Sequence, residues 1–146
     1  MKYVLLCFLS ISTILISCNN NNPGNTSSVT LNGSWRMVAV TDNSTGQTDT
    51  KPSSINGDVD VTFSAASITE GNFSGNTPTN EFINNKYSTG TNQSLSVPAL
   101  NITKVMETTW GKAFVDNIVN SQSYRIQDNT KLEIKTVLKT LFFQKF

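Results

Sequence analysis

The chain has 146 residues with 11 Lys and Arg, 10 Asp and Glu, no His and two Cys, and its formal net charge is +1. Only 14% of the residues are charged and the lysines are dispersed, so no nucleic-acid partner is expected. Both cysteines, Cys7 and Cys18, lie at the N-terminal end. Without His or a Cys in the rest of the chain, triads built on these residues and zinc sites are excluded, so we expect no enzyme, metal or cofactor.

The N-terminal end has the pattern of a bacterial lipoprotein signal peptide, predicted over residues 1–17. Lys2 begins it, an apolar run extends from Tyr3 to Ile16, and the small Ser17 precedes Cys18. This run is shorter than the roughly 20 apolar residues of a transmembrane helix. We therefore expect cleavage before Cys18 and lipid attachment to its thiol. The lipid would anchor the protein to a membrane of the bacterial cell envelope, with the inner and outer membranes equally open.

Residues 18–28 are rich in Asn, with Pro, Gly, Ser and Thr, and are predicted to form a tether. The remaining residues, 29–146, are enough to bury a single hydrophobic core without disulfide bonds. The sequence thus predicts a signal peptide, a tether and one domain, which we expect to be monomeric.

The first part of the domain has the period of two that is typical of strands. Strands or extended segments are predicted over residues 33–40, 59–63, 67–75, 82–87 and 95–105. In the first of them, Trp35, Met37 and Ala39 share one side. Residues 42–58 contain turn-forming pairs and predict a long loop or irregular hairpin connection.

One helix is predicted near residues 107–120. Four apolar residues recur every fourth position, namely Met106, Trp110, Phe114 and Ile118. Glu107 is placed in its first turn and Asn120 at its end. Such a stripe is usually part of a core. Three further strands follow, around residues 124–126, 132–134 and 141–143, so the whole domain is predicted to be α+β with about seven or eight strands.

Several short segments, in this order and spacing, carry a family resemblance that covers residues 31–146. They are Leu31-Asn32-Gly33-Ser34-Trp35, Phe73-Ser74-Gly75, Asn80-Glu81-Phe82, Leu95-Ser96-Val97, Leu100 to Met106, Tyr124-Arg125-Ile126, Leu132-Glu133-Ile134 and Leu141-Phe142-Phe143. Together they resemble the META domain of bacterial envelope and heat-shock-associated lipoproteins. The resemblance implies a twisted, mostly antiparallel, partly closed sheet packed on one helix. It also implies a non-enzymatic, lipid-anchored envelope protein that binds a protein partner or supports stress tolerance.

The chain departs from the family at two positions. Where the family usually has a Gly-Cys-Asn turn, this chain has Pro78-Thr79-Asn80, and residues 107–109 stand where a second cysteine is frequent. A disulfide or redox role is therefore not expected here. Asn80, Glu81 and Thr103 are the candidate contacts for a ligand or partner. An amide that braces a loop is the favoured alternative for Asn80.

Two other hypotheses remain open. The Gly33-Ser34-Trp35 opening resembles that of lipocalins and would imply a carrier of a small apolar ligand. Its cavity would be lined by the aromatic residues Phe63, Phe73, Phe82 and Tyr87. Against this, a lipocalin helix follows the last barrel strand, whereas three candidate strands follow the helix here.

The second alternative is a carbohydrate-directed module that uses Glu70 and Glu81. A glycosidase needs two carboxyl groups about 5 to 9.5 Å apart, and the sequence does not give that distance. Asp58 and Asp60 share one face of a strand, but the rest of a calcium loop is absent, so no calcium site is expected.

Overall fold

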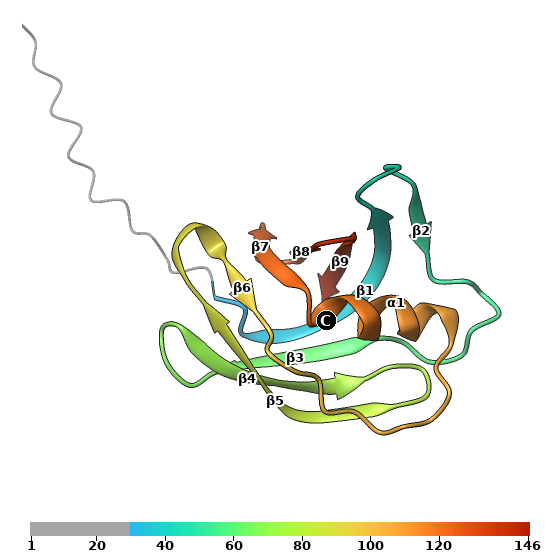
Figure 1. The fold of residues 1–146 in the computed structure, drawn as a ribbon, viewed down its shortest axis with the longest axis horizontal. Helices are drawn as coiled ribbons and strands as arrows, with labels where there is room; N and C mark the ends of the chain where they lie inside the picture. Colours follow the sequence, from blue (N-terminus) through green and yellow to red (C-terminus); the bar gives the residue numbers. More distant parts are fainter. Residues whose placement is uncertain (1–29) are drawn as a thin grey trace, which may run out of the picture.

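The computed structural model describes residues 30–146 (Figure 1). The predicted signal peptide, Cys18 and the tether lie outside the described residues. The strands are β1 Gly33–Asp42, β2 Thr48–Thr50, β3 Asp60–Ala65, β4 Glu70–Asn76, β5 Glu81–Thr89, β6 Leu95–Ser96, β7 Ser121–Gln127, β8 Lys131–Thr136 and β9 Lys139–Lys145. A 3₁₀ turn, η1, covers Thr91–Gln93, and the α-helix α1 covers Thr109–Ile118. No helix in residues 30–146 is long and apolar enough to cross a membrane.

The strands form one antiparallel sheet in the order β6-β5-β4-β3-β1-β9-β8-β7, with β2 added beside β1. A bridge between Ser94 and Ser123 connects the two ends of this order, so the sheet is nearly closed into a barrel. The prediction of a mostly antiparallel, partly closed sheet with one helix is confirmed, although the described residues contain nine strands rather than seven or eight.

An aromatic core fills the interior and connects α1 to both halves of the sheet. Phe114 of α1 stacks on Phe82 of β5 at 5.4 Å between ring centroids, and its other neighbour is Phe143 of β9 at 6.5 Å. Phe73 continues this series at 5.8 Å from Phe82. All four rings are buried, and of the predicted apolar stripe Trp110, Phe114 and Ile118 belong to the core.

A β-bulge interrupts the alternation of buried and exposed side chains that the sequence predicts for β1. Trp35 and Met37 face the core as expected, but the register with β9 shifts between Met37 and Ala39. The extra residue moves the following side chains to the opposite faces, as bulges do. Val40 is consequently buried, whereas Ala39 is not.

The helix begins later than the sequence pattern predicts. Thr108 is the N-cap, and its hydroxyl accepts a hydrogen bond from the Gly111 amide at 3.1 Å. This interaction satisfies one of the free amide groups of the first turn and fixes the helix start. Met106 is therefore outside α1 and is 89% exposed, and Glu107 precedes the N-cap. Placing both residues in the helix was wrong.

Two strand predictions also need correction. The Ser67 hydroxyl accepts hydrogen bonds from the backbone of the next turn, so β4 begins only at Glu70. Of the stretch 95–105, only Leu95–Ser96 forms a strand, and Ile102 adds a single bridge to Phe82. Within residues 42–58, the short strand β2 pairs with β1, so the irregular hairpin is the alternative that forms.

Candidate functional site

Asn80 is the centre of a buried hydrogen-bond network and is only 5% exposed. Its amide nitrogen donates to the carbonyl of Val105 and to Oε2 of Glu107, both at 2.9 Å. Its amide oxygen accepts from the Val105 amide at 2.8 Å and from the Thr103 hydroxyl at 3.0 Å. Because this side chain is satisfied within the protein, its role is to hold the segment before α1 against the start of β5.

Glu107 completes the same network. Its carboxylate accepts hydrogen bonds from the hydroxyls of Thr77 and Thr79, the second at 2.8 Å, and from the Thr108 amide at 3.0 Å. Burial opposes ionisation of Glu107, but the hydrogen bonds from Thr77, Asn80, Thr79 and Thr108 outweigh it. The pKa of this carboxyl group therefore lies below its ordinary value. Glu107 could not be predicted as a partner of Asn80 because the two residues are 27 positions apart in the chain.

The three predicted contact residues, Asn80, Glu81 and Thr103, thus lie together. Their hydrogen bonds are made within the protein and stabilise the fold. The Thr103 hydroxyl accepts from the Glu81 amide at 3.0 Å and donates to Asn80. Glu81 itself has an exposed side chain at the start of β5. Thr103 is exposed as well, but its hydroxyl is used by Glu81 and Asn80, whereas the Glu81 carboxylate makes no hydrogen bond within residues 30–146.

Glu70 and Glu81 do not form a pair of carboxylates. Glu70 begins β4 and is aligned with Ser88, whereas Glu81 begins β5 and is aligned with Asn76. The two residues lie at opposite ends of this antiparallel pair, six residues apart along β4, which corresponds to about 20 Å. This separation exceeds the spacing that glycoside hydrolysis needs.

The carboxylates of Asp58 and Asp60 form ion pairs with basic side chains of the protein. Asp60 forms a two-pronged hydrogen-bonded pair with Arg36, with both distances 2.8 Å, and Asp58 lies 2.7 Å from the Lys51 ammonium group. The hydrogen bond from Lys51 lowers the pKa of Asp58. No cluster of three or more possible metal ligands occurs within residues 30–146.

The rings that the carrier hypothesis assigned to a cavity wall pack against one another. Phe63 lies 5.5 Å from Phe73 and 5.3 Å from Tyr87, measured between ring centroids, and Phe82 continues the series. The interior is therefore occupied here by side chains of the protein, which removes the part of the carrier hypothesis that rested on these rings.

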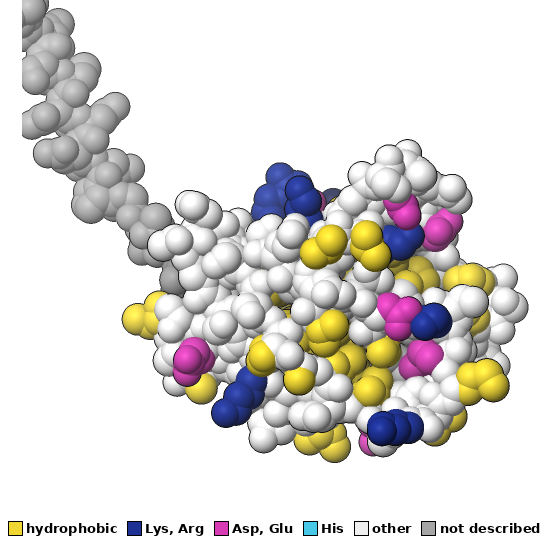
Figure 2. All heavy atoms as spheres, viewed as in Figure 1, with side chains coloured by type: hydrophobic (Ala, Val, Ile, Leu, Met, Phe, Trp, Pro, Cys, Tyr) yellow, Lys and Arg dark blue, Asp and Glu magenta, His cyan; other side chains and the backbone are white. Residues whose placement is uncertain are grey.

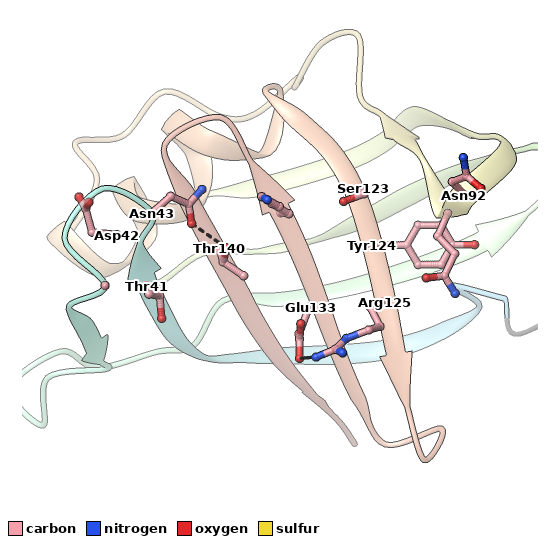
Figure 3. Close-up of a pocket in the computed structure, with 12 residues that line it drawn as sticks. Thr41, Asp42, Asn43, Asn92, Ser123, Tyr124, Arg125, Glu133 and Thr140 are labelled. Atoms are coloured by element: carbon pink, nitrogen blue, oxygen red, sulfur yellow. Dashed lines mark hydrogen bonds and ion pairs between the residues drawn. The ribbon is translucent and has the colours of Figure 1, made fainter.

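The outer face of β1, β9, β8 and β7 carries a shallow depression of about 560 Å³, which we call the outer-face hollow (Figure 3). Its lining comprises Thr41, Asp42, Asn43, Gly46, Asn92, Gln93, Ser123, Tyr124, Arg125, Glu133, Lys135 and Thr140. Strand pairing creates a row of neighbours across this face. Ser123 is aligned with Lys135, Lys135 with Thr140, and Thr140 with Thr41.

Side chains in this row point away from the core because successive residues of a strand face opposite sides. In β8, Leu132, Ile134 and Thr136 are buried, so Glu133 and Lys135 point outward. A polar, solvent-facing surface results, with Lys135 between the hydroxyl-bearing residues of two neighbouring strands.

Most charges around the outer-face hollow are paired. Arg125 lies 2.8 Å from Glu133, as Figure 3 shows, and this hydrogen bond raises the pKa of Arg125. Asp42 lies 2.8 Å from Lys139 at the same end of the sheet, and hydrogen bonds from Lys139 and Ser44 lower its pKa. Lys135 takes part in none of the ion pairs found in residues 30–146. It is therefore available to a negatively charged group from outside.

Charged side chains are dispersed over the face drawn in Figure 2. Lys, Arg, Asp and Glu are separated there by uncharged groups in white and by hydrophobic side chains in yellow. Within this view there is no continuous basic stripe of the kind that a polyanion would require.

No family model matches the chain, and no curated protein matches it either. A solved structure is similar, the NMR structure of a protein from Burkholderia xenovorans. The two chains are 17% identical with a TM-score of 0.56, and the alignment covers 96% of this chain and 99% of the other. At this identity the similarity concerns the fold, which is that of a β-rich domain with a nearly closed antiparallel sheet.

Proposed function

We propose that the protein is a non-enzymatic, lipid-anchored protein of the bacterial cell envelope that binds an envelope protein through the outer-face hollow. Lys135 carries this proposal. It lies exposed in the middle of the hollow without an ion pair among residues 30–146, while Arg125 and Lys139 are paired. An acidic side chain of a partner would form an ion pair with Lys135 and accept hydrogen bonds from the hydroxyl groups beside it.

We also propose that the domain is META-like. The positions at which META domains carry cysteines are occupied here by Thr79 and by residues 107–109. In this structure the Thr79 hydroxyl lies 2.8 Å from the Glu107 carboxylate. The contact between these two segments supports the proposal, and here it is made by hydrogen bonds.

The location follows from the signal-like segment that ends at Cys18. Two or three acyl chains bind a bilayer almost permanently, since each buried methylene contributes about 0.8 kcal/mol. A tethered domain of this kind meets partners within the envelope, where the tether raises their effective concentration.

Photo-crosslinking in the native bacterium tests the binding surface. A crosslinking residue replaces Gln93, an exposed residue of the outer-face hollow, and the control replaces Lys104, an exposed residue outside its lining. We expect a discrete protein-sized adduct from position 93 and none from position 104. Adding Lys135→Glu should lower the yield about tenfold, because a like charge then faces the acidic partner.

The charge control is Lys104→Glu, which makes the same change elsewhere on the surface and should leave the adduct unchanged. Equal yields from positions 93 and 104, or an adduct insensitive to Lys135→Glu, would contradict the assignment of this surface.

A further inference from the structure

A second depression, of about 530 Å³, lies at one end of the barrel, and we call it the mouth pocket. It is formed where the chain enters β1, where β3 turns into β4 and where β5 ends. Its lining comprises Thr30, Leu31, Ala65, Ser67, Ile68, Thr69, Glu70, Tyr87, Thr89, Gly90, Thr91 and Tyr124. Only Tyr124 is shared with the outer-face hollow.

Tyr87 is held firmly at this pocket. Its ring packs edge-on against Phe63 at 5.3 Å and is only 6% exposed. It lies over Gly71, the residue with which it is aligned on β4. A Cβ atom at Gly71 would lie 2.5 Å from the Tyr87 hydroxyl oxygen, so glycine is needed for this ring position. The ring is therefore fixed before any ligand arrives.

The hydroxyl groups of Tyr87 and Tyr124 have no hydrogen-bond partner among residues 30–146. Burial raises the pKa of both, and the nearby Tyr124 adds to the effect on Tyr87. Both phenols are consequently neutral at physiological pH and can each donate one hydrogen bond. Two phenol side chains that line the same pocket without using their hydroxyl donors are a feature of binding pockets rather than of ordinary surface.

We infer that the mouth pocket binds a neutral sugar unit of a glycan. The phenols and the hydroxyls of Ser67, Thr69, Thr89 and Thr91 match a ligand that is rich in hydroxyl groups. Ile68, which is 97% exposed, supplies apolar surface for the C–H face of a sugar ring. Glu70 is the only charged residue of the lining, so it accepts from sugar hydroxyls and disfavours anionic ligands.

Of the two carboxylates in the carbohydrate hypothesis, Glu70 lines this pocket and Glu81 does not, so we infer sugar binding and no hydrolysis. It goes beyond the proposed function, because it concerns a different surface and does not require the lipid anchor. Thr30, the first described residue, belongs to the lining, so the pocket lies where the predicted tether joins the domain.

Tyrosine-specific NMR tests it on the full chain in detergent micelles. The chain has three Tyr, and labelling their Cζ atoms with ¹³C gives one signal each for Tyr3, Tyr87 and Tyr124. We expect chitotriose or cellotriose, two neutral trisaccharides, to shift the signals of Tyr87 and Tyr124 and leave that of Tyr3 in place. Tyr87→Phe should weaken binding about fivefold to tenfold, the usual loss for one hydrogen bond.

Tyr87→Phe removes only an unpartnered hydroxyl and keeps the ring that packs on Phe63, so the variant should fold. Tyr3→Phe is the matched control and should bind as the parent does. The absence of shifts with both neutral trisaccharides up to about 10 mM, above the Kd of even a weak site, would overturn the inference. Equal binding of an anionic trigalacturonate, or unchanged binding by Tyr87→Phe, would overturn it as well.

Discussion

Replacing Asn80 with Ala should lower the free energy of unfolding by about 3 kcal/mol, because several buried groups lose their partner at once. The Val105 amide and carbonyl, the Thr103 hydroxyl and the Glu107 carboxylate all bind this side chain. For a domain of this size, the midpoint of thermal unfolding should fall by about 12 °C. Urea and thermal unfolding followed by circular dichroism measure both quantities.

The matched control is Asn56→Ala, at an exposed position of the loop between β2 and β3. We expect a change within about 0.5 kcal/mol there, as for most surface substitutions. If Asn80→Ala were as mild as this control, the network would not stabilise the fold. Asn80 would then return as a candidate contact for a ligand or partner.

The second large effect is expected for Phe114→Ala, which should cost about 4 kcal/mol through lost burial and the cavity left behind. Phe114 is fully buried and connects Phe82 on one half of the sheet with Phe143 on the other. Its loss therefore weakens the contact of α1 with both halves. A shift of the urea midpoint at constant m-value would report this change in stability.

Phe146→Ala removes the same side chain from a surface position, since Phe146 is 63% exposed and its ring lies 4.7 Å from the Arg36 guanidinium. The expected cost is below about 1 kcal/mol. Similar costs for both substitutions would show that the interior is loosely filled. That result would return support to the carrier hypothesis.

The general architecture could be predicted because periodicity reports burial. Strands with one buried face alternate, as β3 does with Val61 and Phe63, and α1 repeats its core residues every fourth position. The details that failed depend on single local interactions. The bulge after Met37 and the cap at Thr108 have no periodic signal, so the facing of Ala39 and the helix start were predicted wrongly.

The candidate surfaces were harder to predict from the sequence because they depend on which strands become neighbours in the sheet. Thr41 and Thr140 are almost a hundred residues apart, yet they are aligned on β1 and β9. One signal was available within the hairpin of β7 and β8. Counting outward from a three-residue turn, Asp128 to Thr130, aligns Arg125 with Glu133, an opposite-charge pair on the outer face.

Lipid attachment is the most direct test of the central claim, that this is an anchored protein of the cell envelope. The parent chain and Cys18→Ser are expressed in the bacterium with an alkyne-tagged palmitate, and labelled protein is detected after membrane fractionation. We expect the parent chain to be labelled and bound to the membrane, and the Cys18→Ser variant to carry no label. A parent chain without label, or a labelled Cys18→Ser variant, would contradict lipid attachment at Cys18.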